Sequence, residues 1–352
     1  MADPSDKGAP QWVVSAPPHV KGPDSTPRIM WTVVASLAPA SLAGFWLFGI
    51  SAVMVVLAAI AGAVVTERLC GKPASLMDGS GVITGLLLGL TLPPGFPMWM
   101  AFVGGAFGLG FGKLIFGGLG NNVFNPALLG RAFLQAAFPV AITTWPATGG
   151  SFFALKGDTF ALPLMSPKLN LNGLGESGID VVTEATPLSL MKFEGQGTGM
   201  TELFLGSTSG SIGETSAVLI LLGGLFLAWK NYLNWRIPVS IFATVGLMGA
   251  LLYGIGYEAY PGGPLFLLGA GGLMLGAVYM ATDMVTSPVT NRGALWFGFG
   301  VGLLVVLIRV WGGLSEGVMY AILLMNTLVP FINRKTQPRV FGTRLKSAEE
   351  AR

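Results

Sequence analysis

Long apolar runs dominate the hydrophobic pattern of this chain. A helix needs about 20 apolar residues to cross the hydrocarbon core of a membrane, within a range of about 17 to 25. Nine runs reach or approach that length, and they lie at 29–48, 49–66, 97–115, 124–142, 216–229, 237–254, 264–281, 294–311 and 317–332. A tenth run, 79–92, is shorter and ends at two prolines, so it fits a thin spanning helix or a re-entrant half-helix. The pattern therefore predicts an all-α polytopic membrane protein.

The distribution of charged residues decides between nine and ten crossings. Lys and Arg in short loops stay on the cytoplasmic side of a membrane. If 79–92 spans, the basic C-terminal tail falls on one side together with Arg68, Lys72, Lys113, Lys230, Arg236 and Arg292. The long segment 143–215, with three lysines against seven acidic residues, then lies on the opposite side. Arg309 fits poorly, at the outer end of its helix. We expect about ten transmembrane helices, with both termini cytoplasmic.

This topology divides the chain into five parts. Residues 1–28 contain no apolar region ahead of the first long run, so we expect a disordered cytoplasmic tail rather than a signal peptide. The two membrane parts are 29–142 and 216–332, separated by an extracytoplasmic loop at 143–215. A basic cytoplasmic tail, 333–352, follows the last run.

The two membrane parts share a short internal repeat. A shift of 195 residues aligns 115–119 with 310–314, and it places Thr-Leu-Pro at 91–93 on Thr-Ser-Pro at 286–288. Because five crossings per part is an odd number, two such repeats must be inverted relative to one another. Pro-interrupted helices in equivalent positions then meet near the midplane of the membrane. Chance similarity between two Gly-rich apolar segments is the alternative.

Composition removes several classes of function. Of 352 residues, 52% are hydrophobic and 11% are charged, less than half the usual share of about 25%. A single cysteine, Cys70, excludes a disulfide framework, a CxxC redox pair and an iron–sulfur cluster held by this chain alone. A single histidine, His19, lies in the N-terminal tail, which nearly excludes His-based zinc or general-base chemistry. We assign no catalytic residue and no metal site, and we expect no nucleic-acid partner.

Several motifs in matching order carry a resemblance to a known family. They are Asp-Gly-Ser at 78–80, Thr-Gly-Leu-Leu-Leu at 84–88, Phe-Asn-Pro-Ala at 124–127, Ser-Ile-Gly-Glu-Thr at 211–215, Ala-Thr-Asp-Met-Val-Thr-Ser-Pro at 281–288 and Arg-Val-Phe-Gly at 339–342. The chain resembles the RnfD component of the Rnf electron-transport complex, which is related to the NqrB component of the sodium-translocating NADH:quinone reductase. The resemblance runs from about residue 28 to 342, and its last motif favours the Rnf branch.

The resemblance implies that the chain carries FMN, attached through its phosphate to a threonine in the extracytoplasmic loop. Thr186 matches the acceptor of that family. The residues that match the recognition motif around it are Asp180, Thr183 and Ala185. Val181 and Glu184 stand where the family commonly has glycine. A second, non-covalently bound flavin is also compatible with the resemblance.

The resemblance further implies a component of a multisubunit oxidoreductase that is not active alone. The complex would pass electrons between reduced ferredoxin and NAD⁺ in the bacterial inner membrane and drive Na⁺ or H⁺ across it. Expected partners are the other Rnf subunits, with their flavins and iron–sulfur clusters, a flavin transferase for maturation, and the lipid bilayer. No soluble nucleotide-binding motif is visible, so NAD and ferredoxin are expected to bind elsewhere in the complex.

Acidic residues beside helix breaks are the candidates for a cavity that binds an ion or the second flavin. Charged groups at membrane depth are expensive and are usually paired or functional. Asp283, beside the break at Pro288, and Asp78, at the equivalent end of the other half, are the first choices, and Glu214 is the third. Helix caps and interfacial charges are the alternative interpretation of all three.

Three other functions stay open at this point. The inverted repeat alone suits a flavin-free channel for a small polar solute. The chain would otherwise be an NqrB-like component of the quinone reductase, or a scaffold that lost its flavin through Val181 and Glu184. An FMN adduct in the intact-protein mass would remove the channel and the scaffold together.

Overall fold

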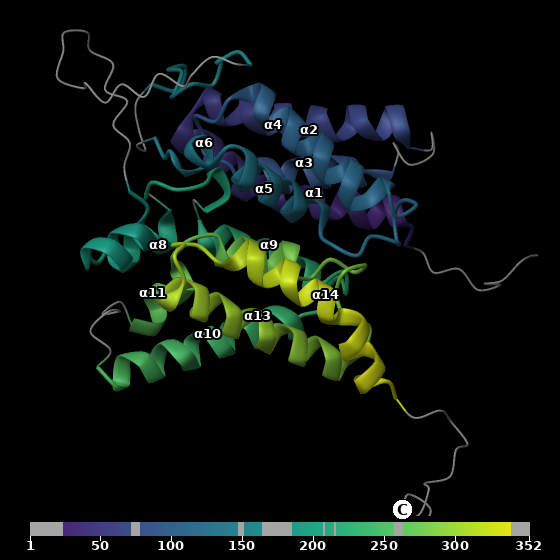
Figure 1. The fold of residues 1–352 in the computed structure, drawn as a ribbon, viewed down its shortest axis with the longest axis vertical. Helices are drawn as coiled ribbons and strands as arrows, with labels where there is room; N and C mark the ends of the chain where they lie inside the picture. The colour runs from purple at the N-terminus through teal and green to yellow at the C-terminus, as the bar shows by residue number, and fades with distance from the viewer. Residues whose placement is uncertain are drawn as a thin grey trace, which may run out of the picture.

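The computed structural model describes residues 24–71, 78–146, 151–163, 185–206, 208–214, 216–256 and 263–338. These residues form helices and the loops that connect them (Figure 1), as the all-α prediction requires. Four of the helices are long and apolar enough to cross a membrane, and one bent helix pair provides a fifth candidate. The structure is therefore that of a multi-pass membrane protein, while the expected ten crossings stay a prediction.

The first half of the chain, coloured purple to teal in Figure 1, begins with two long helices, α1 (Thr26–Phe48) and α2 (Ile50–Cys70). The shorter helices that follow are α3 (Ser80–Leu90), α4 (Met98–Leu109) with its π-helical continuation η2 (Gly110–Leu114), α5 (Pro126–Ala137) and α6 (Pro139–Thr143). The prediction of one helix over 124–142 is wrong. Phe138 leaves the helical conformation, because the residue before a proline is disfavoured in the α region, and Pro139 starts a new helix.

The second half, green to yellow in Figure 1, contains a helix that breaks in its middle. The intact helices are α9 (Ala217–Trp229), α10 (Arg236–Gly254), α13 (Asn291–Trp311) and α14 (Val318–Thr336). Between α10 and α13 lie α11 (Gly263–Gly269), α12 (Leu273–Leu275) and π-helical η5 (Gly276–Met280). The chain bends by 67° between α11 and α12, so the expected continuous helix over 264–281 is wrong. Gly271 takes a left-handed φ of 70° there, which only glycine adopts readily.

The described parts of the long connecting segment contain several short helices. They are α7 (Pro187–Ser189), π-helical η3 (Leu190–Glu194), α8 (Met200–Leu205) and the 3₁₀ turn η4 (Ile212–Glu214). In Figure 1 this segment lies at the left, whereas α14 runs to its end at the right. The boundaries expected between the membrane parts, the loop and the tails stay predictions.

The 195-residue offset found in the sequence reappears in the hydrogen bonds. Arg131 on α5 donates to the carbonyl oxygen of Thr91, which follows α3, at 2.8 Å. Asn326 on α14 stands 195 residues after Arg131, and it donates to the carbonyl oxygen of Thr286 at 3.3 Å when its amide nitrogen faces that oxygen. Thr91 and Thr286 are themselves 195 residues apart. The repeat has this contact in common, while the inversion of the halves across a membrane stays a prediction.

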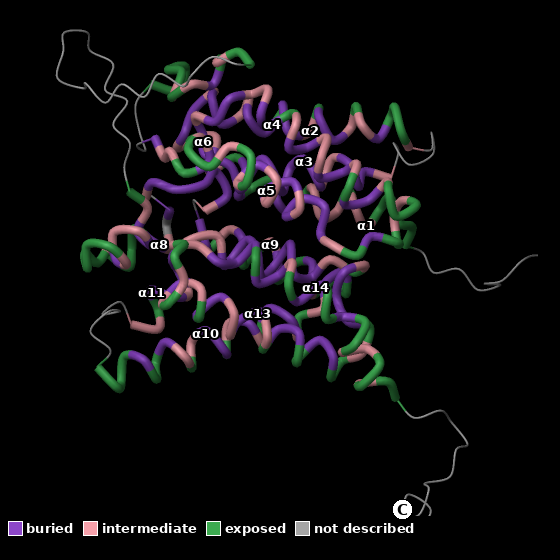
Figure 2. Tube along the Cα trace, viewed as in Figure 1, coloured by how far each residue is buried: buried purple, intermediate pink, exposed green. Residues whose placement is uncertain are grey.

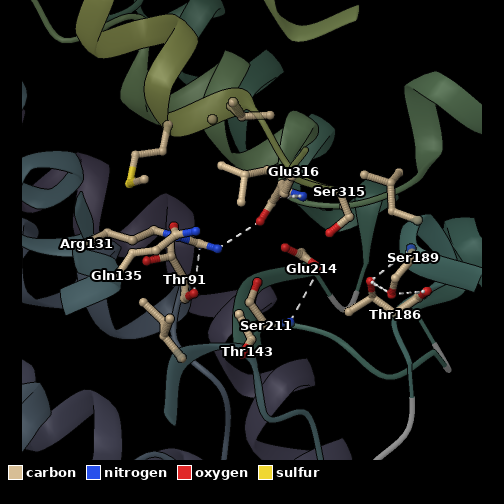
Figure 3. Close-up of a pocket in the computed structure, with 18 of the residues that line it drawn as sticks. Thr91, Arg131, Gln135, Thr143, Thr186, Ser189, Ser211, Glu214, Ser315 and Glu316 are labelled. Carbon is tan, nitrogen blue, oxygen red and sulfur yellow. Dashed lines mark hydrogen bonds and ion pairs between the residues drawn. The ribbon is translucent and has the colours of Figure 1, made fainter. Parts of the chain in front are cut away.

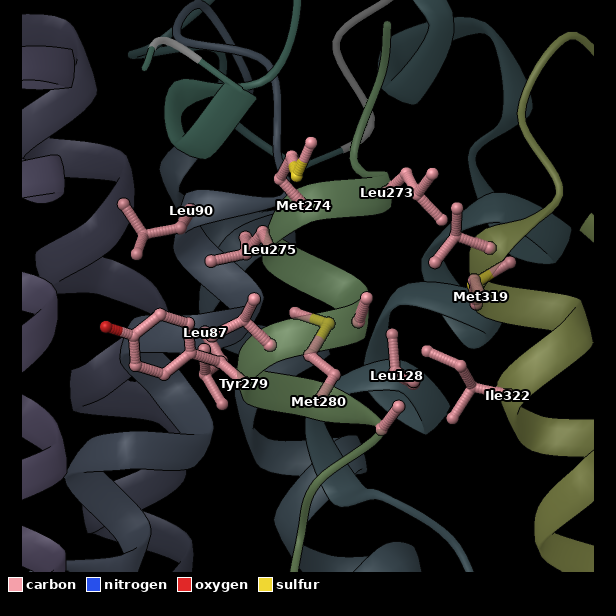
Figure 4. Packing of buried hydrophobic residues seen from close by; sticks show 14 of the residues in the cluster. Leu87, Leu90, Leu128, Leu273, Met274, Leu275, Tyr279, Met280, Met319 and Ile322 are labelled. Carbon is pink, nitrogen blue, oxygen red and sulfur yellow. The ribbon is translucent and has the colours of Figure 1, made fainter. Parts of the chain in front are cut away.

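Buried residues lie within each half and also where the two halves meet (Figure 2). The unit α12–η5 lies in this interface, with Leu87 and Leu90 of α3 on one side and Ile322 of α14 on the other (Figure 4). The hydroxyl of Tyr279 on η5 donates to the carbonyl oxygen of Ser36 on α1 at 3.2 Å. Large apolar side chains also stay exposed on the outward faces of the helices, as expected for surfaces that contact lipid; they include Trp46, Leu225, Trp229 and Leu247.

Helices α2 and α4 pack closely against each other in the first half. A Cβ added to Gly62 of α2 would lie 2.0 Å from the carbonyl oxygen of Phe102 on α4. Conversely, a Cβ added to Gly105 of α4 would lie 2.2 Å from the carbonyl oxygen of Ala59 on α2. Small residues let helix backbones approach this closely, as is common in membrane proteins. Part of the glycine excess of the chain thus allows the close packing of α2 against α4.

Candidate functional site

A cavity of about 500 Å³ opens between the two halves of the protein (Figure 3). Its volume falls in the range of small-molecule sites, which is about 300 to 1,000 Å³. The wall combines α5 of the first half with α12, η5 and the start of α14 of the second. The connecting segment closes the remaining side through 185–193 and η4. The cavity therefore exists only when the halves and the connecting segment are assembled.

The break between α11 and α12 forms one side of this cavity, and charged groups satisfy its backbone. Arg309, which is fully buried on α13, donates to the carbonyl oxygens of Leu267 at 2.7 Å and Ala270 at 2.9 Å. Glu316 accepts a hydrogen bond from the backbone N–H of Gly272 at 2.7 Å. A cation at the end of one helix and an anion at the start of the next complement both helix dipoles. This explains why Arg309, misplaced by the charge rule, is tolerated at its position.

Arg131 joins the two halves across the cavity. It is a buried side chain of α5, and its Nη2 lies 2.8 Å from Oε2 of Glu316 in the loop between α13 and α14. Its Nη1 donates to the carbonyl oxygen of Thr91, as described above. Because Glu316 is 185 residues away in sequence, the partner of Arg131 could not be identified from the apolar run that contains it.

The structure places the expected flavin acceptor at this cavity. Thr186 and Ala185 line it, whereas Asp180 and Thr183 lie outside the described residues. Thr186 is the N-cap of α7, and its Oγ1 lies 2.8 Å from the Ser189 hydroxyl and accepts the Ser189 N–H at 3.3 Å. An N-cap uses its side-chain oxygen as an acceptor. Esterification of this hydroxyl would remove its hydrogen and leave the oxygen in place.

A lysine that the sequence did not single out holds this segment against α13. Lys192 of η3 donates from Nζ to the carbonyl oxygens of Ile308, Gly312 and Leu314, the last at 2.8 Å. These oxygens lie at the C-terminal end of α13, where a cation is favourable. The contact fixes 185–194 relative to the loop that carries Glu316.

Replacing Lys192 by methionine should loosen this segment and leave the rest of the protein folded. Methionine keeps an apolar stem but cannot donate to the three carbonyls, so we expect proteolytic cleavage within 185–206 to become several-fold faster, as expected for increased local opening. Cleavage sites and rates are read by mass spectrometry. Glu194→Gln, an exposed change in the same helix, is the control. Equal cleavage rates in the two variants would show that the lysine does not hold the segment.

Glu214 lies on the cavity wall with one carboxylate oxygen unpaired. Its Oε2 accepts the backbone N–H of Ser211 at 3.4 Å, whereas its buried Oε1 has no hydrogen-bond partner among the described residues. The hydroxyl of Ser211, which also lines the cavity, is likewise buried and unpartnered there. Burial, followed by the nearby Glu316, raises the pKa of Glu214 to about 8. Unpaired buried polar groups that line a cavity point to a missing hydrogen-bonding ligand.

The other two acidic candidates gather around a second, smaller cavity of about 110 Å³. Asp283 lines it and accepts the hydroxyl of Thr286 at 3.3 Å. Asp78 accepts the N–H of Ser80 at 2.8 Å, and Ser80 lines the same cavity. The structure thus brings Asp78 and Asp283 towards one cavity and places Glu214 at the other. The second cavity is smaller than typical small-molecule sites, so it fits an ion better than a flavin.

A buried ion pair stands beside this second cavity. Lys113 of η2 is 1% exposed, and its Nζ lies 2.6 Å from Oε1 of Glu67 on α2, which is 2% exposed. Lys113 also donates to the hydroxyl of Ser80. The sequence suggested Lys113 only as a cytoplasmic loop charge. The signal available in the sequence is that Lys113 lies near the end of one apolar run and Glu67 directly after another.

The residues at the larger cavity fit an FMN group. The Thr186 hydroxyl can serve as the ester oxygen, and Leu188, Phe193 and Leu314 provide apolar surface for a ring system. Ser211 and Glu214 offer unpaired hydrogen-bonding atoms to the polar edge of that ring. The volume, the apolar wall and the few polar groups together match the usual composition of a cofactor site.

Comparison with known proteins agrees with the motifs. A family model described as NQR2, RnfD, RnfE matches residues 13–342. The D subunit of the proton-translocating ferredoxin:NAD(+) oxidoreductase complex of Clostridium ljungdahlii is 43% identical over 347 residues, which cover 95% of this chain and 97% of that protein. The D subunit of the ion-translocating oxidoreductase complex of Stutzerimonas stutzeri is 42% identical over 334 residues, 90% of this chain and 92% of that protein. The D subunit of the Na(+)-translocating ferredoxin:NAD(+) oxidoreductase complex of Acetobacterium woodii is 38% identical over 347 residues, 96% of this chain and 98% of that protein. The chain belongs to the NQR2, RnfD, RnfE family.

Proposed function

We propose that this chain is the membrane subunit of an ion-translocating ferredoxin:NAD⁺ oxidoreductase and carries FMN on Thr186. The observation that carries the flavin part is that Thr186 lines a cavity of about 500 Å³ which also contains the unpartnered Ser211 hydroxyl and Glu214 Oε1. The relatives support the rest, since their names describe subunits of ferredoxin:NAD(+) oxidoreductase complexes over nearly the whole chain.

The residues of the cavity have separate tasks in this proposal. Thr186 holds the phosphate, and Lys192 holds the segment of Thr186 against α13. Leu188 and Phe193 exclude water from the ring, while Ser211 and Glu214 orient its polar edge. The flavin, when bound, supplies the electron-accepting chemistry, and the protein positions it and tunes its potential.

The position of the subunit follows from the expected topology. The protein is a multi-pass protein of the bacterial inner membrane with cytoplasmic termini, and the Thr186 segment faces outward, where a transferase reaches it. The flavin would supply an electron carrier between the other flavin and iron–sulfur carriers of the complex, whose electron transfer is coupled to transport of Na⁺ or H⁺. The names of the relatives include one proton-translocating and one Na(+)-translocating complex, so the family relationship does not select the ion.

Replacing Thr186 by valine should abolish covalent flavin attachment completely, because valine has no oxygen to form the phosphoester. The full chain is produced in a host with a flavin transferase. The band on a denaturing gel is then examined under ultraviolet light, and the intact mass is measured. We expect a fluorescent band and the mass of one FMN adduct in the unmodified sequence, and neither in the variant.

Thr201→Val, an exposed change on α8 of the same segment, is the matched control and should stay fluorescent. A fluorescent Thr186→Val band would place the attachment elsewhere. Absence of any adduct in the unmodified sequence would favour a scaffold or a channel. Loss of NADH-to-quinone rather than ferredoxin-to-NAD⁺ activity on deletion of the chain would favour the quinone reductase.

A further inference from the structure

Two carboxyl groups from different segments face each other on the wall of the large cavity. Glu214 comes from η4 and Glu316 from the loop between α13 and α14 (Figure 3). A Cβ added to Gly272, at the start of α12, would lie 2.6 Å from Oε1 of Glu316 and 3.3 Å from Oε1 of Glu214. The absence of a side chain at Gly272 leaves the two oxygens side by side.

The hydrogen bonds of the two groups are unequal. Both oxygens of Glu316 are occupied as acceptors, Oε1 by the Gly272 N–H at 2.7 Å and Oε2 by Arg131 at 2.8 Å. This pattern defines Glu316 as a carboxylate. Glu214 has only the long contact from Ser211 on Oε2, and its buried Oε1 is without a partner in the described structure. A proton on Oε1 of Glu214 would supply the missing donor.

The surrounding charges favour the same distribution of protons. The charged groups that face the pair are Arg131 from α5 and Arg309 from α13, and both act on Glu316. Lys192 of η3 is occupied by carbonyl oxygens at the end of α13. Burial opposes ionisation of Glu316, but the two arginines outweigh it and hold its pKa below the usual value. Since neighbouring buried carboxyl groups do not both ionise readily, the remaining proton stays on Glu214.

We propose that Glu214 is a redox-linked proton site: it shares one proton with Glu316 and binds that proton more tightly when the flavin in the cavity is reduced. This inference rests on the proposed function for its trigger. Where Glu214 is ionised, near pH 8 and above, an electron placed on the bound flavin by the other carriers of the complex would be balanced by a proton from water. One O–H bond of water breaks and leaves hydroxide, one O–H bond forms at Oε1 of Glu214, and no covalent bond of the protein breaks. The site thereby couples charge in the cavity to protonation.

The proton itself can be observed without any flavin. Infrared spectra of the purified protein distinguish the C=O stretch of a protonated carboxyl group from carboxylate bands, and H/D exchange identifies it. Because the raised pKa of Glu214 is about 8, we expect this band at pH 7, half its intensity near pH 8, and its loss at pH 10. Glu214→Gln should lack the band at every pH. Glu202→Gln, an exposed change on α8, should keep it.

A second variant should lower the pKa of Glu214 while keeping its carboxyl group. Glu316→Gln removes the neighbouring negative charge that raises the Glu214 pKa and leaves Arg131 for Glu214. The band should then be lost at a lower pH than in the unmodified protein, although burial still raises the pKa of Glu214. A band that survives in Glu214→Gln, or that titrates between pH 4 and 5 in the unmodified sequence, would overturn the proposal even if one of the variants folds poorly.

The link to the flavin is measured by its midpoint potential in the intact complex. A tenfold change in proton concentration shifts a one-electron couple by about 59 mV when one proton accompanies the electron. Glutamine cannot ionise, so the midpoint potential of the Glu214→Gln protein should lack the pH dependence that this carboxyl group contributes. Above pH 8 the unmodified protein should show the steeper decrease with pH, by up to that amount per unit. Identical slopes from pH 7 to 10 would refute the redox link.

The failures of the two proposals are distinguishable. Thr186→Val protein without flavin should still show the infrared titration of Glu214, since the carboxyl pair does not depend on the cofactor. A Thr186→Val protein that keeps its flavin would disprove the attachment site and leave the proton on Glu214 untouched. An infrared band unaffected by Glu214→Gln would disprove the proton site and leave the attachment of flavin to Thr186 untouched.

Discussion

Replacing Lys113 by methionine is expected to destabilise the protein by about 3–5 kcal/mol, the usual consequence of removing one partner of a buried ion pair. Methionine occupies similar volume but leaves the Glu67 carboxylate, 2% exposed, without the ammonium 2.6 Å away. The hydroxyl of Ser80 loses the same donor, and the start of α3 is held less firmly. The midpoint of denaturant-induced unfolding of the purified protein in detergent measures the effect.

Two controls separate the lost charge pair from lost packing. Lys113→Met combined with Glu67→Gln removes both charges, and it should recover a large part of the stability because no buried charge is left unpaired. Lys230→Met, at the exposed end of α9, should change stability little. If the double variant is as unstable as Lys113→Met alone, the destabilisation does not come from the loss of the ammonium group beside Glu67.

Gly105→Val should separate α2 from α4 and lower stability by about 3 kcal/mol or more, at the upper end of the range for overpacked cores. A Cβ at this position would lie 2.2 Å from the carbonyl oxygen of Ala59, and the reciprocal glycine, Gly62, has no room to yield because Phe102 O lies 2.0 Å from its own Cβ position. The backbones must move apart, which also disturbs α3, packed against α2. The yield of monodisperse protein in detergent and its unfolding midpoint report the change.

Gly246→Ala is the matched control within another membrane helix. A Cβ there meets Leu268 at an ordinary 3.7 Å, and alanine has the higher helix propensity, so stability should be unchanged or slightly higher. Gly105→Val protein with the same unfolding midpoint as Gly246→Ala would contradict the close crossing of α2 and α4.

The sequence predicted what depends on local pattern. Apolar runs located α1, α2, α10 and α13, because a membrane helix requires a continuous stretch of apolar residues. The bend between α11 and α12 was not predicted, although four consecutive small residues, 269–272, lie at this point of the chain. Its backbone groups are satisfied by Arg309 and Glu316, and such partners are not encoded in the run itself.

The site shows the same division between local and distant information. Thr186 was identified through a motif, whereas the cavity around it is formed by residues that lie far apart in the sequence. Arg131 and Glu316 are 185 positions apart, and Lys192 and Leu314 are 122 apart. Nothing in one sequence without its relatives specifies such pairs. A charge inside an apolar run is the one usable sign in the sequence: Arg131 lies within the run 124–142, but the run does not identify its partner.

Arg131 and Asn326 make the two related halves of the molecule chemically different. At positions related by the 195-residue offset, both side chains bind the carbonyl of a threonine, Thr91 or Thr286. Only the longer, charged Arg131 also reaches an acidic residue of the opposite half. If the two related positions carried the same residue, they could make the same contacts. Of these two related positions, only the one on α5 therefore places a positive charge against the opposite half of the molecule.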